Sequence, residues 1–203
     1  HGPLLPRWRI GTVPFRETLS RPMEMRRGLF LWSLLAAVVA ALSLGPSFAH
    51  VLEAAPRLTV WPPELWRETT VFNRQFEFFA IVGAPLDVGV IIVLAVLTWL
   101  LRRQRRSFHY ALAATVLYAA ALATWFAWVA PANAVLATWT EGPVPADFAA
   151  VRDRWETGHM AVAAWKFAGF IALTCGLLSI HREPSADRSS PASPSRSAGN
   201  PPR

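Results

Sequence analysis

The 203-residue chain has little charge, a single cysteine and a single lysine, Lys166. Charged residues make up 16% of the sequence, whereas a typical soluble domain carries roughly 25%. This deficit disfavours both a soluble enzyme and a disordered chain. The lone Cys175 excludes an intramolecular disulfide and any site built from several thiolate ligands.

Common catalytic motifs are missing as well. The chain contains no glycine-rich nucleotide-binding loop, no HExxH zinc motif and no GxSxG nucleophile motif. Nucleotide chemistry and the common hydrolase reactions are therefore disfavoured. The net charge of +7 would suit a nucleic-acid partner, but the arginines gather at the ends of apolar runs, so we expect no nucleic acid to bind.

Long apolar runs are what the sequence has in abundance. They cover residues 28–49, 78–101, 108–132 and 158–180. Each is long enough to cross a hydrocarbon core of roughly 30 Å as a helix, and lipid offers an unpaired backbone no hydrogen-bond partners. The sequence therefore predicts an all-α fold, a bundle of four transmembrane helices in contact with the lipid bilayer.

The arginines predict the orientation of this bundle. Arg26 and Arg27 precede the first run, four arginines lie within residues 102–106, and others follow the last run. The positive-inside rule then places both the N and the C terminus in the cytoplasm. We expect a multi-pass protein of the cell membrane, specifically of a bacterial cytoplasmic membrane.

Two flanking segments differ from this membrane domain of residues 25–181. Residues 1–24 contain four prolines without periodicity and are predicted to be a disordered or untranslated extension, with a natural start at Met25. Residues 182–203 are rich in serine and proline, which is typical of a disordered tail.

The first run has a second interpretation. Met25-Arg26-Arg27, the apolar stretch and Ser47-Phe48-Ala49 also fit a cleavable signal peptide. Cleavage would leave His50 at the N terminus and three spans in the membrane.

Polar residues interrupt the second and fourth runs at regular spacing. At about 100° per residue, four polar residues before and within the fourth run share one narrow face if the helix extends outward without a break. Three polar residues before and within the second run share a face in the same way if that helix is also unbroken. The two sets are Arg152, Glu156, His159 and Lys166, and Asn73, Glu77 and Asp87.

The spacing within these two stripes predicts a buried ion pair. Asp87 follows Asn73 by the same number of residues as Lys166 follows Arg152. Because both helices run inward, Asp87 and Lys166 should lie at similar depth and face each other, unless Pro85 shifts the register. Such a pair serves either to specify helix packing or as the floor of an outward-facing polar cavity.

Further candidates gather at the outer ends of the predicted spans. We treat His50, His159 and Asn133 as candidate catalytic residues. Two histidines without matched spacing indicate neither a metal site nor haem, so we expect no metal and no cofactor. The candidate substrate-binding residues are Trp139, Trp155, Glu53 and Arg152.

The second half of the chain resembles a known family. Pro131-Ala132-Asn133, Trp139, Asp147-Phe148 and the stretch 152–159 are similar to the anthrone-oxygenase-like family of small four-helix membrane proteins. The motif covers 131–159, and the layout covers roughly 28–180. The resemblance implies a four-helix bundle and, for some fungal members, oxygenation of an anthrone to an anthraquinone. Members usually carry an arginine where this chain has Val162, and Lys166 is the candidate replacement.

Three functions remain open at this point. One is a membrane scaffold or accessory role, in which the polar stripes only specify packing. Another is a cofactor-independent oxygenase or related oxidoreductase acting on an apolar anthrone- or quinone-like molecule, with histidine as the base and Trp139 and Trp155 stacking on the substrate. The last is a proton-coupled carrier with Asp87 and Lys166 as a relay.

Overall fold

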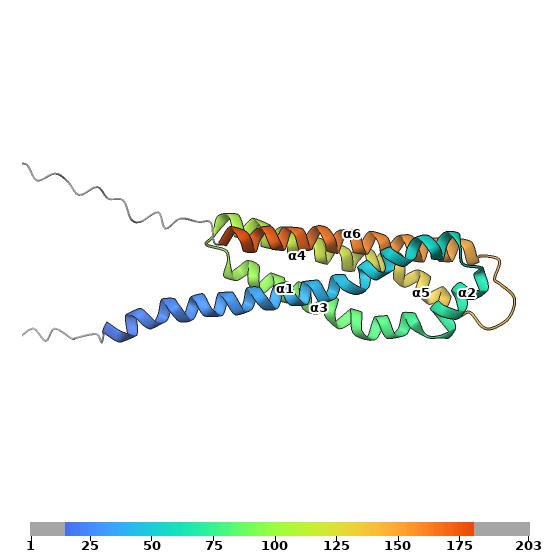
Figure 1. Cartoon of the computed structure of the whole chain (residues 1–203), viewed down its shortest axis with the longest axis horizontal. Helices are drawn as coiled ribbons and strands as arrows, with labels where there is room; N and C mark the ends of the chain where they lie inside the picture. Colours follow the sequence, from blue (N-terminus) through green and yellow to red (C-terminus); the bar gives the residue numbers. More distant parts are fainter. Residues whose placement is uncertain (1–14, 181–203) are drawn as a thin grey trace, which may run out of the picture.

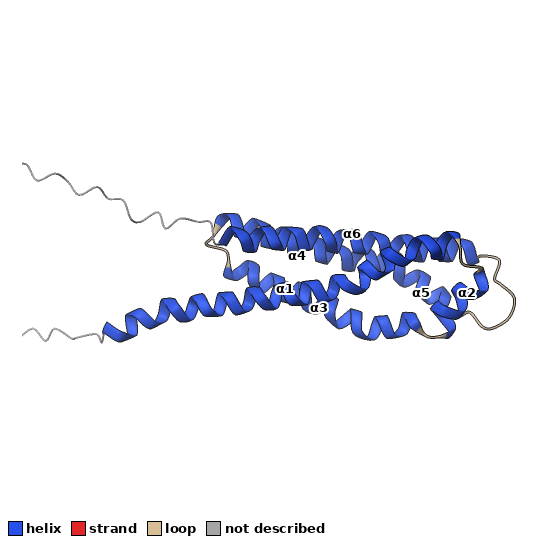
Figure 2. Ribbon diagram, in the orientation of Figure 1, coloured by secondary structure: helices blue, strands red, loops and turns tan. Residues whose placement is uncertain are grey.

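The computed structural model describes the backbone of residues 15–180 and the side chains of residues 27–74 and 77–180. The predicted tail of residues 182–203 and residues 1–14 of the predicted extension lie outside the described part. Within it, the elements are helices and turns without a strand (Figure 2). The predicted all-α fold is therefore confirmed.

Four long helical segments run alternately in opposite directions (Figure 1). They are α1 (Phe15–Thr59), α3 (Gln75–Leu100), α4 (Arg105–Thr124) and α6 (Phe148–Ile180). A π-helical turn, η2 (Trp125–Val129), joins α4 to α5 (Ala130–Leu136), and two short elements, α2 (Pro63–Arg67) and η1 (Glu68–Phe72), join α1 to α3.

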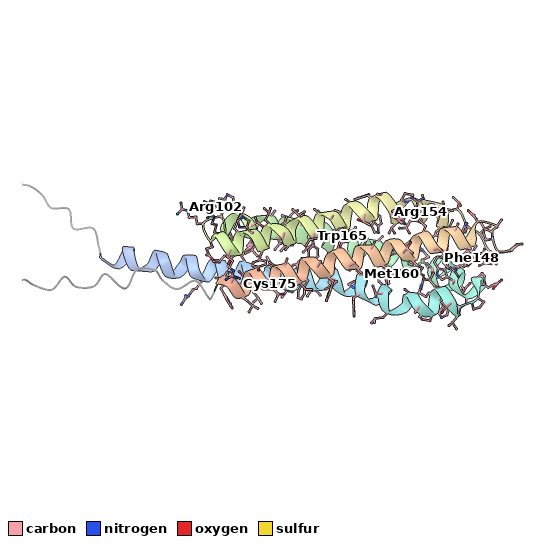
Figure 3. All side chains as sticks on the ribbon, turned by 90° about the horizontal axis from the view of Figure 1, so that it is seen from above. Arg102, Phe148, Arg154, Met160, Trp165 and Cys175 are labelled. Carbon is pink, nitrogen blue, oxygen red and sulfur yellow. The ribbon has the colours of Figure 1, made fainter. Side chains whose placement is uncertain are left out.

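All four predicted spans are present, and three of them are longer than the corresponding apolar runs. The stretches long and apolar enough to cross a membrane are Arg27–Thr59, Glu77–Leu100, Arg105–Leu136 and Phe148–Ile180. Figure 3 shows Arg102 at one end of the bundle and Phe148 at the other. We call the Phe148 end the outer end, following the arginine distribution, and we call α2, η1 and the loop 137–147 the cap.

Two local expectations differ from the structure. Residues 15–24, predicted to lack regular structure, belong to α1, whose first turns extend beyond the other helices (Figure 1). Adding residues to an existing helix costs little compared with nucleating one.

The unbroken helix assumed from Asn73 to Asp87 is also wrong, because Arg74 adopts a left-handed conformation with φ of 57° and α3 begins only at Gln75.

The buried residues of α1 form a single seam with alternating spacings of four and three. This is the heptad pattern of helices that pack at a small crossing angle. Small residues occupy the inner part of the seam, where they allow close approach of neighbouring helices, and larger polar residues follow toward the outer end. The seam consists of Ala36, Ala40, Ser43, Ser47, His50, Ala54 and Arg57.

Two separate apolar cores result from this arrangement. The inner core is built mainly from α1, α3 and α4 and includes Val90, Leu94 and Tyr118. The outer core joins the cap to α5 and α6 and includes Trp66 and Leu136. Polar side chains of α1, α3 and α6 lie between the two cores.

Close packing of α4 on α6 depends on glycine. A Cβ atom at Gly169 would lie 2.8 Å from Cδ2 of Tyr118, and the Tyr118 hydroxyl is itself held by donating a hydrogen bond of 2.9 Å to the carbonyl of Ala40. Tyr118 therefore connects α4 to α1 while its ring covers Gly169 of α6.

We predict that Gly169→Ala lowers the stability of the protein although alanine is the better helix former. Alanine stabilises a helix interior by about 1 kcal/mol relative to glycine, but overpacking against Tyr118 costs about 1–3 kcal/mol. The matched control is Gly89→Ala, because a Cβ at Gly89 meets no atom within 4 Å. Thermal unfolding in detergent micelles should show a lower midpoint for Gly169→Ala only; equal midpoints for the two variants would contradict this packing.

Candidate functional site

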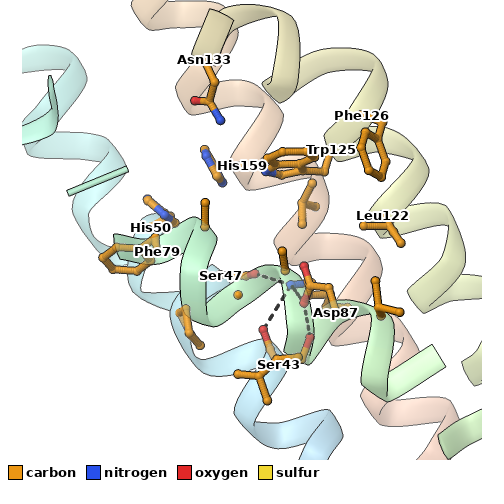
Figure 4. A pocket seen from close by; sticks show the side chains of 18 of the residues that line it. Ser43, Ser47, His50, Phe79, Asp87, Leu122, Trp125, Phe126, Asn133 and His159 are labelled. Atoms are coloured by element: carbon orange, nitrogen blue, oxygen red, sulfur yellow. Dashed lines mark hydrogen bonds and ion pairs between the residues drawn. The ribbon is translucent and has the colours of Figure 1, made fainter. Parts of the chain in front are cut away.

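A cavity of about 120 Å³ lies between the inner and outer cores. Its walls come from α1, α3 and α6 and from the segment that runs from α4 through η2 to α5 (Figure 4). The predicted residues His50, Asp87, Asn133, His159 and Lys166 line it, as does Trp155. Residues from opposite ends of the sequence therefore share one site.

The floor of the cavity is an ion pair between α6 and α3. Lys166 Nζ lies 2.6 Å from Asp87 Oδ1, so the two residues predicted to pair are in contact although Pro85 lies inside α3. The ammonium also donates to Ser47 Oγ at 3.0 Å and to the carbonyl of Ser43 at 3.2 Å. Ser43 Oγ in turn donates to Asp87 Oδ1 at 2.6 Å. All three donors of the ammonium group are thus satisfied.

Two histidine rings stack on each other above this floor. The centroids of His50 and His159 lie 4.2 Å apart with an interplanar angle of 21°. The Trp155 ring meets His159 at 4.3 Å, and Phe79 meets His50 at 5.2 Å. His50 is 6% exposed, and its Nδ1 has no hydrogen-bond partner among the described residues.

Asn133 reaches the site because the third span changes its helical pitch. Pro131 has no N–H to donate to the Ala127 carbonyl one turn earlier, and Arg154 Nη2 approaches that carbonyl instead at 3.3 Å. The π-helical turn η2 lies here, and such turns are frequent at functional sites. Asn133 Oδ1 accepts a hydrogen bond of 2.7 Å from Trp155 Nε1, and Figure 4 shows its amide directed toward His159.

A second buried ion pair closes the outer side. Arg57 Nε lies 2.6 Å from Glu156 Oε1, which also accepts a hydrogen bond of 2.8 Å from Trp66 Nε1. Arg57 Nη2 donates to Thr70 Oγ1 at 2.5 Å. The Arg57 guanidinium lies over the rings of Trp66 and Trp155, at 5.4 and 5.3 Å from their centroids, a cation–π arrangement.

The remaining part of the cap is held by Arg67. Its guanidinium donates to the carbonyl oxygens of Thr140 at 2.6 Å, Gly142 at 3.0 Å and Pro143 at 3.3 Å. Arg67 thereby joins α2 to the loop before α6. Because the cap covers the outer side of the cavity, the predicted polar cavity does not open directly outward.

Three of the predicted binding residues lie outside the cavity. Trp139 packs in the cap, with its ring centroid 5.9 Å from that of Phe148. The half-exposed Glu53 lies 3.7 Å from Arg57 Nη1. Arg152 pairs with the neighbouring Asp153 at 3.0 Å. These residues belong to the outer surface and the cap rather than to the cavity wall.

Sequence reasoning missed several residues that build the site. Arg57, Ser43 and Ser47 were not among the predicted site residues, although all three lie on the heptad seam of α1. The alternating spacing of four and three through His50 was the available signal. For Phe79 and Phe126, which line the cavity from α3 and η2, no comparable pattern exists in the sequence.

The fold and the polar layer define a multi-pass helical membrane protein. In the described part of the chain, no group of three or more His, Cys, Asp or Glu side chains could hold a metal ion. Neither a protein-family model, nor a curated protein, nor a solved structure matches the chain.

We predict that Asp87 and Lys166 depend on each other for stability. Asp87→Asn or Lys166→Met alone leaves one buried charge without its partner, which costs about 3–5 kcal/mol. The double variant removes both charges and should be less destabilised than the sum of the single variants. A double-mutant cycle of unfolding free energies in detergent micelles measures this coupling.

The pair of the partly buried Arg152 and the exposed Asp153 is the matched control for that cycle. Asp153 is 57% exposed, and exposed pairs contribute at most about 1 kcal/mol. Arg152→Gln with Asp153→Asn should therefore show little coupling. Additive effects of Asp87→Asn and Lys166→Met would refute the predicted dependence.

Proposed function

We propose that this protein is a membrane-embedded, cofactor-independent oxidoreductase, which uses oxygen to oxidise a hydroquinone-like ring bound between the histidines and the Asp87–Lys166 pair. The observation that carries the proposal is the stacked pair His50 and His159, 4.2 Å apart at the wall of the cavity. The resemblance to the anthrone-oxygenase-like family supports the oxidation of an aromatic ring by oxygen without a cofactor.

The size of the cavity favours a single ring. Its volume of about 120 Å³ compares with roughly 150 Å³ for an engineered protein cavity that holds benzene. A three-ring anthrone would need a larger space. A one-ring hydroquinone is therefore the substrate class that we propose in place of an anthrone.

The polar groups lie at both ends of such a ring. His159 and Lys166 are seven residues apart on one face of α6, which corresponds to about 10.5 Å along the axis. A ring with two para oxygens, hydrogen-bonded to His159 at one end and lying near the Lys166 charge at the other, spans a similar length. Trp155, Phe79 and Trp125 supply apolar or aromatic surface for its faces.

The chemistry requires a base and an electron acceptor. A neutral imidazole accepts the phenolic proton, the Asn133 amide stabilises the phenolate by a hydrogen bond, and the Lys166 ammonium stabilises it by charge. Molecular oxygen is the acceptor: it takes two electrons and two protons from the hydroquinone. The products are one quinone and one hydrogen peroxide, so that atoms and electrons balance.

We predict that the purified protein in lipid nanodiscs oxidises a short-chain hydroquinone with oxygen. Quinone absorbance and hydrogen peroxide should appear in equal amounts. Removal of a general base typically slows a reaction by about 10²–10⁴-fold, so His159→Ala should lower the rate by at least about a hundredfold.

The control variant is His109→Ala. His109 is exposed near the arginine-rich turn, and its Nδ1 lies 2.6 Å from the carbonyl oxygen of Arg105, so its loss should leave the rate unchanged. Thermal unfolding checks that both variants are folded. A wild-type rate equal to that of folded His159→Ala would refute the proposed oxidation.

A further inference from the structure

We infer that the molecule bound in this cavity carries a hydrocarbon tail and enters sideways from the bilayer, through a slot between the outer half of α3 and η2. The identity of its ring rests on the proposed function. The lateral path rests on separate observations about which sides of the cavity are closed.

The outer side of the cavity is closed by the cap and the ion pair beneath it. Trp66 and Glu156 are completely buried, Arg57 is 1% exposed and Trp155 is 2% exposed. Glu156 accepts hydrogen bonds from both Arg57 and Trp66. A ring arriving from outer water would have to separate these groups.

The inner side is closed by tight packing. Below the Asp87–Lys166 pair, Val90, Leu94 and Tyr118 are at most 2% exposed. The Tyr118 ring lies against Gly169, and its hydroxyl is bonded to α1.

The side between α3 and η2 is different. From Glu77 to Gly89, α3 has no buried residue, and the first buried one is Val90. The cavity-lining residues here are exposed: Phe79 by 37%, Val88 by 48% and Phe126 of η2 by 62%. Figure 4 shows Phe79 and Phe126 on opposite sides of the cavity.

Small residues of α3 leave this slot open. Ala80, Gly83 and Ala84 line the cavity, and a Cβ at Gly83 would meet no atom within 4 Å. In membrane proteins, small residues usually allow another helix to approach closely. Among the described residues, no helix makes such an approach at Gly83, and Figure 1 shows the outer end of α3 far from α6.

The distribution of polarity selects an amphiphilic molecule. The inner wall carries the two histidines, Asn133 and the ion pair, whereas the rim consists of exposed apolar side chains within two predicted spans. A polar aromatic head fits the interior, and an alkyl tail passing between Phe79 and Phe126 stays in hydrocarbon. Such a molecule reaches the site without opening the cap.

A photolabelling experiment tests this path. The probe is a phenol with a ten-carbon para chain that carries a diazirine close to the ring, added to the full chain in phosphatidylcholine nanodiscs, with labelled residues mapped by mass spectrometry. We expect labels on residues 79–88 and 122–126 that excess 4-alkylphenol suppresses. A ten-carbon alcohol with the same diazirine but no ring should not label these residues selectively.

Two neighbouring substitutions sharpen the test. Gly83→Phe fills the slot and should lower the labelling by at least about tenfold. Val82→Phe is the matched control, because Val82 is 60% exposed and does not line the cavity; it should change labelling little. Equal effects of both substitutions, or equal labelling by the ring-free probe, would overturn the inference.

Failure of the inference and failure of the proposed function give different results. Phenol binding needs no turnover, so ring-dependent labelling without quinone formation would refute the oxidation and retain lateral access. Oxidation of a short-chain hydroquinone without ring-dependent labelling would refute lateral access and retain the oxidation.

Discussion

The arrangement of this protein depends on how the free-energy cost of placing the charged Lys166 side chain in the membrane is offset. A charged side chain deep in a bilayer costs at least about 2.5–3.5 kcal/mol. Lys166 meets this cost through Asp87 of α3 and two oxygens of α1, from Ser43 and Ser47. One ammonium group therefore binds α6 to both α1 and α3 at the same level of the bundle. The apolar inner core ends at this level, and the polar cavity begins there.

The outer half of the bundle is organised by a second buried charge, Glu156, and its partner Arg57. Glu156 lies on α6 ten residues before Lys166 and is completely buried, so that α1 must supply Arg57 at the matching level. The Arg57 guanidinium is surrounded by tryptophan rings, and the cap forms around it. The space between the two ion pairs is where His50 and His159 stack, and its only exposed apolar rim among the described residues lies along α3 and η2.

Much of this could be predicted because it is local in the chain. Hydropathy identifies the spans, and the helical period places Glu156, His159 and Lys166 on one face of α6. The period is less reliable where the backbone departs from a regular helix. Arg74 interrupts the segment before α3, and the turn at η2 changes the pitch before Asn133; neither departure has a clear signal in side-chain hydropathy.

By itself, the sequence determined four membrane spans and the shared face of Glu156, His159 and Lys166 on α6, because apolar length and residue spacing are properties of each helix alone. Only the tertiary structure decided that Arg57 pairs with Glu156, that the two histidines stack, and that the cavity is covered on its outer side. These outcomes depend on which helix faces which and how far each tilts, and helical periodicity specifies a face without specifying the neighbour that covers it.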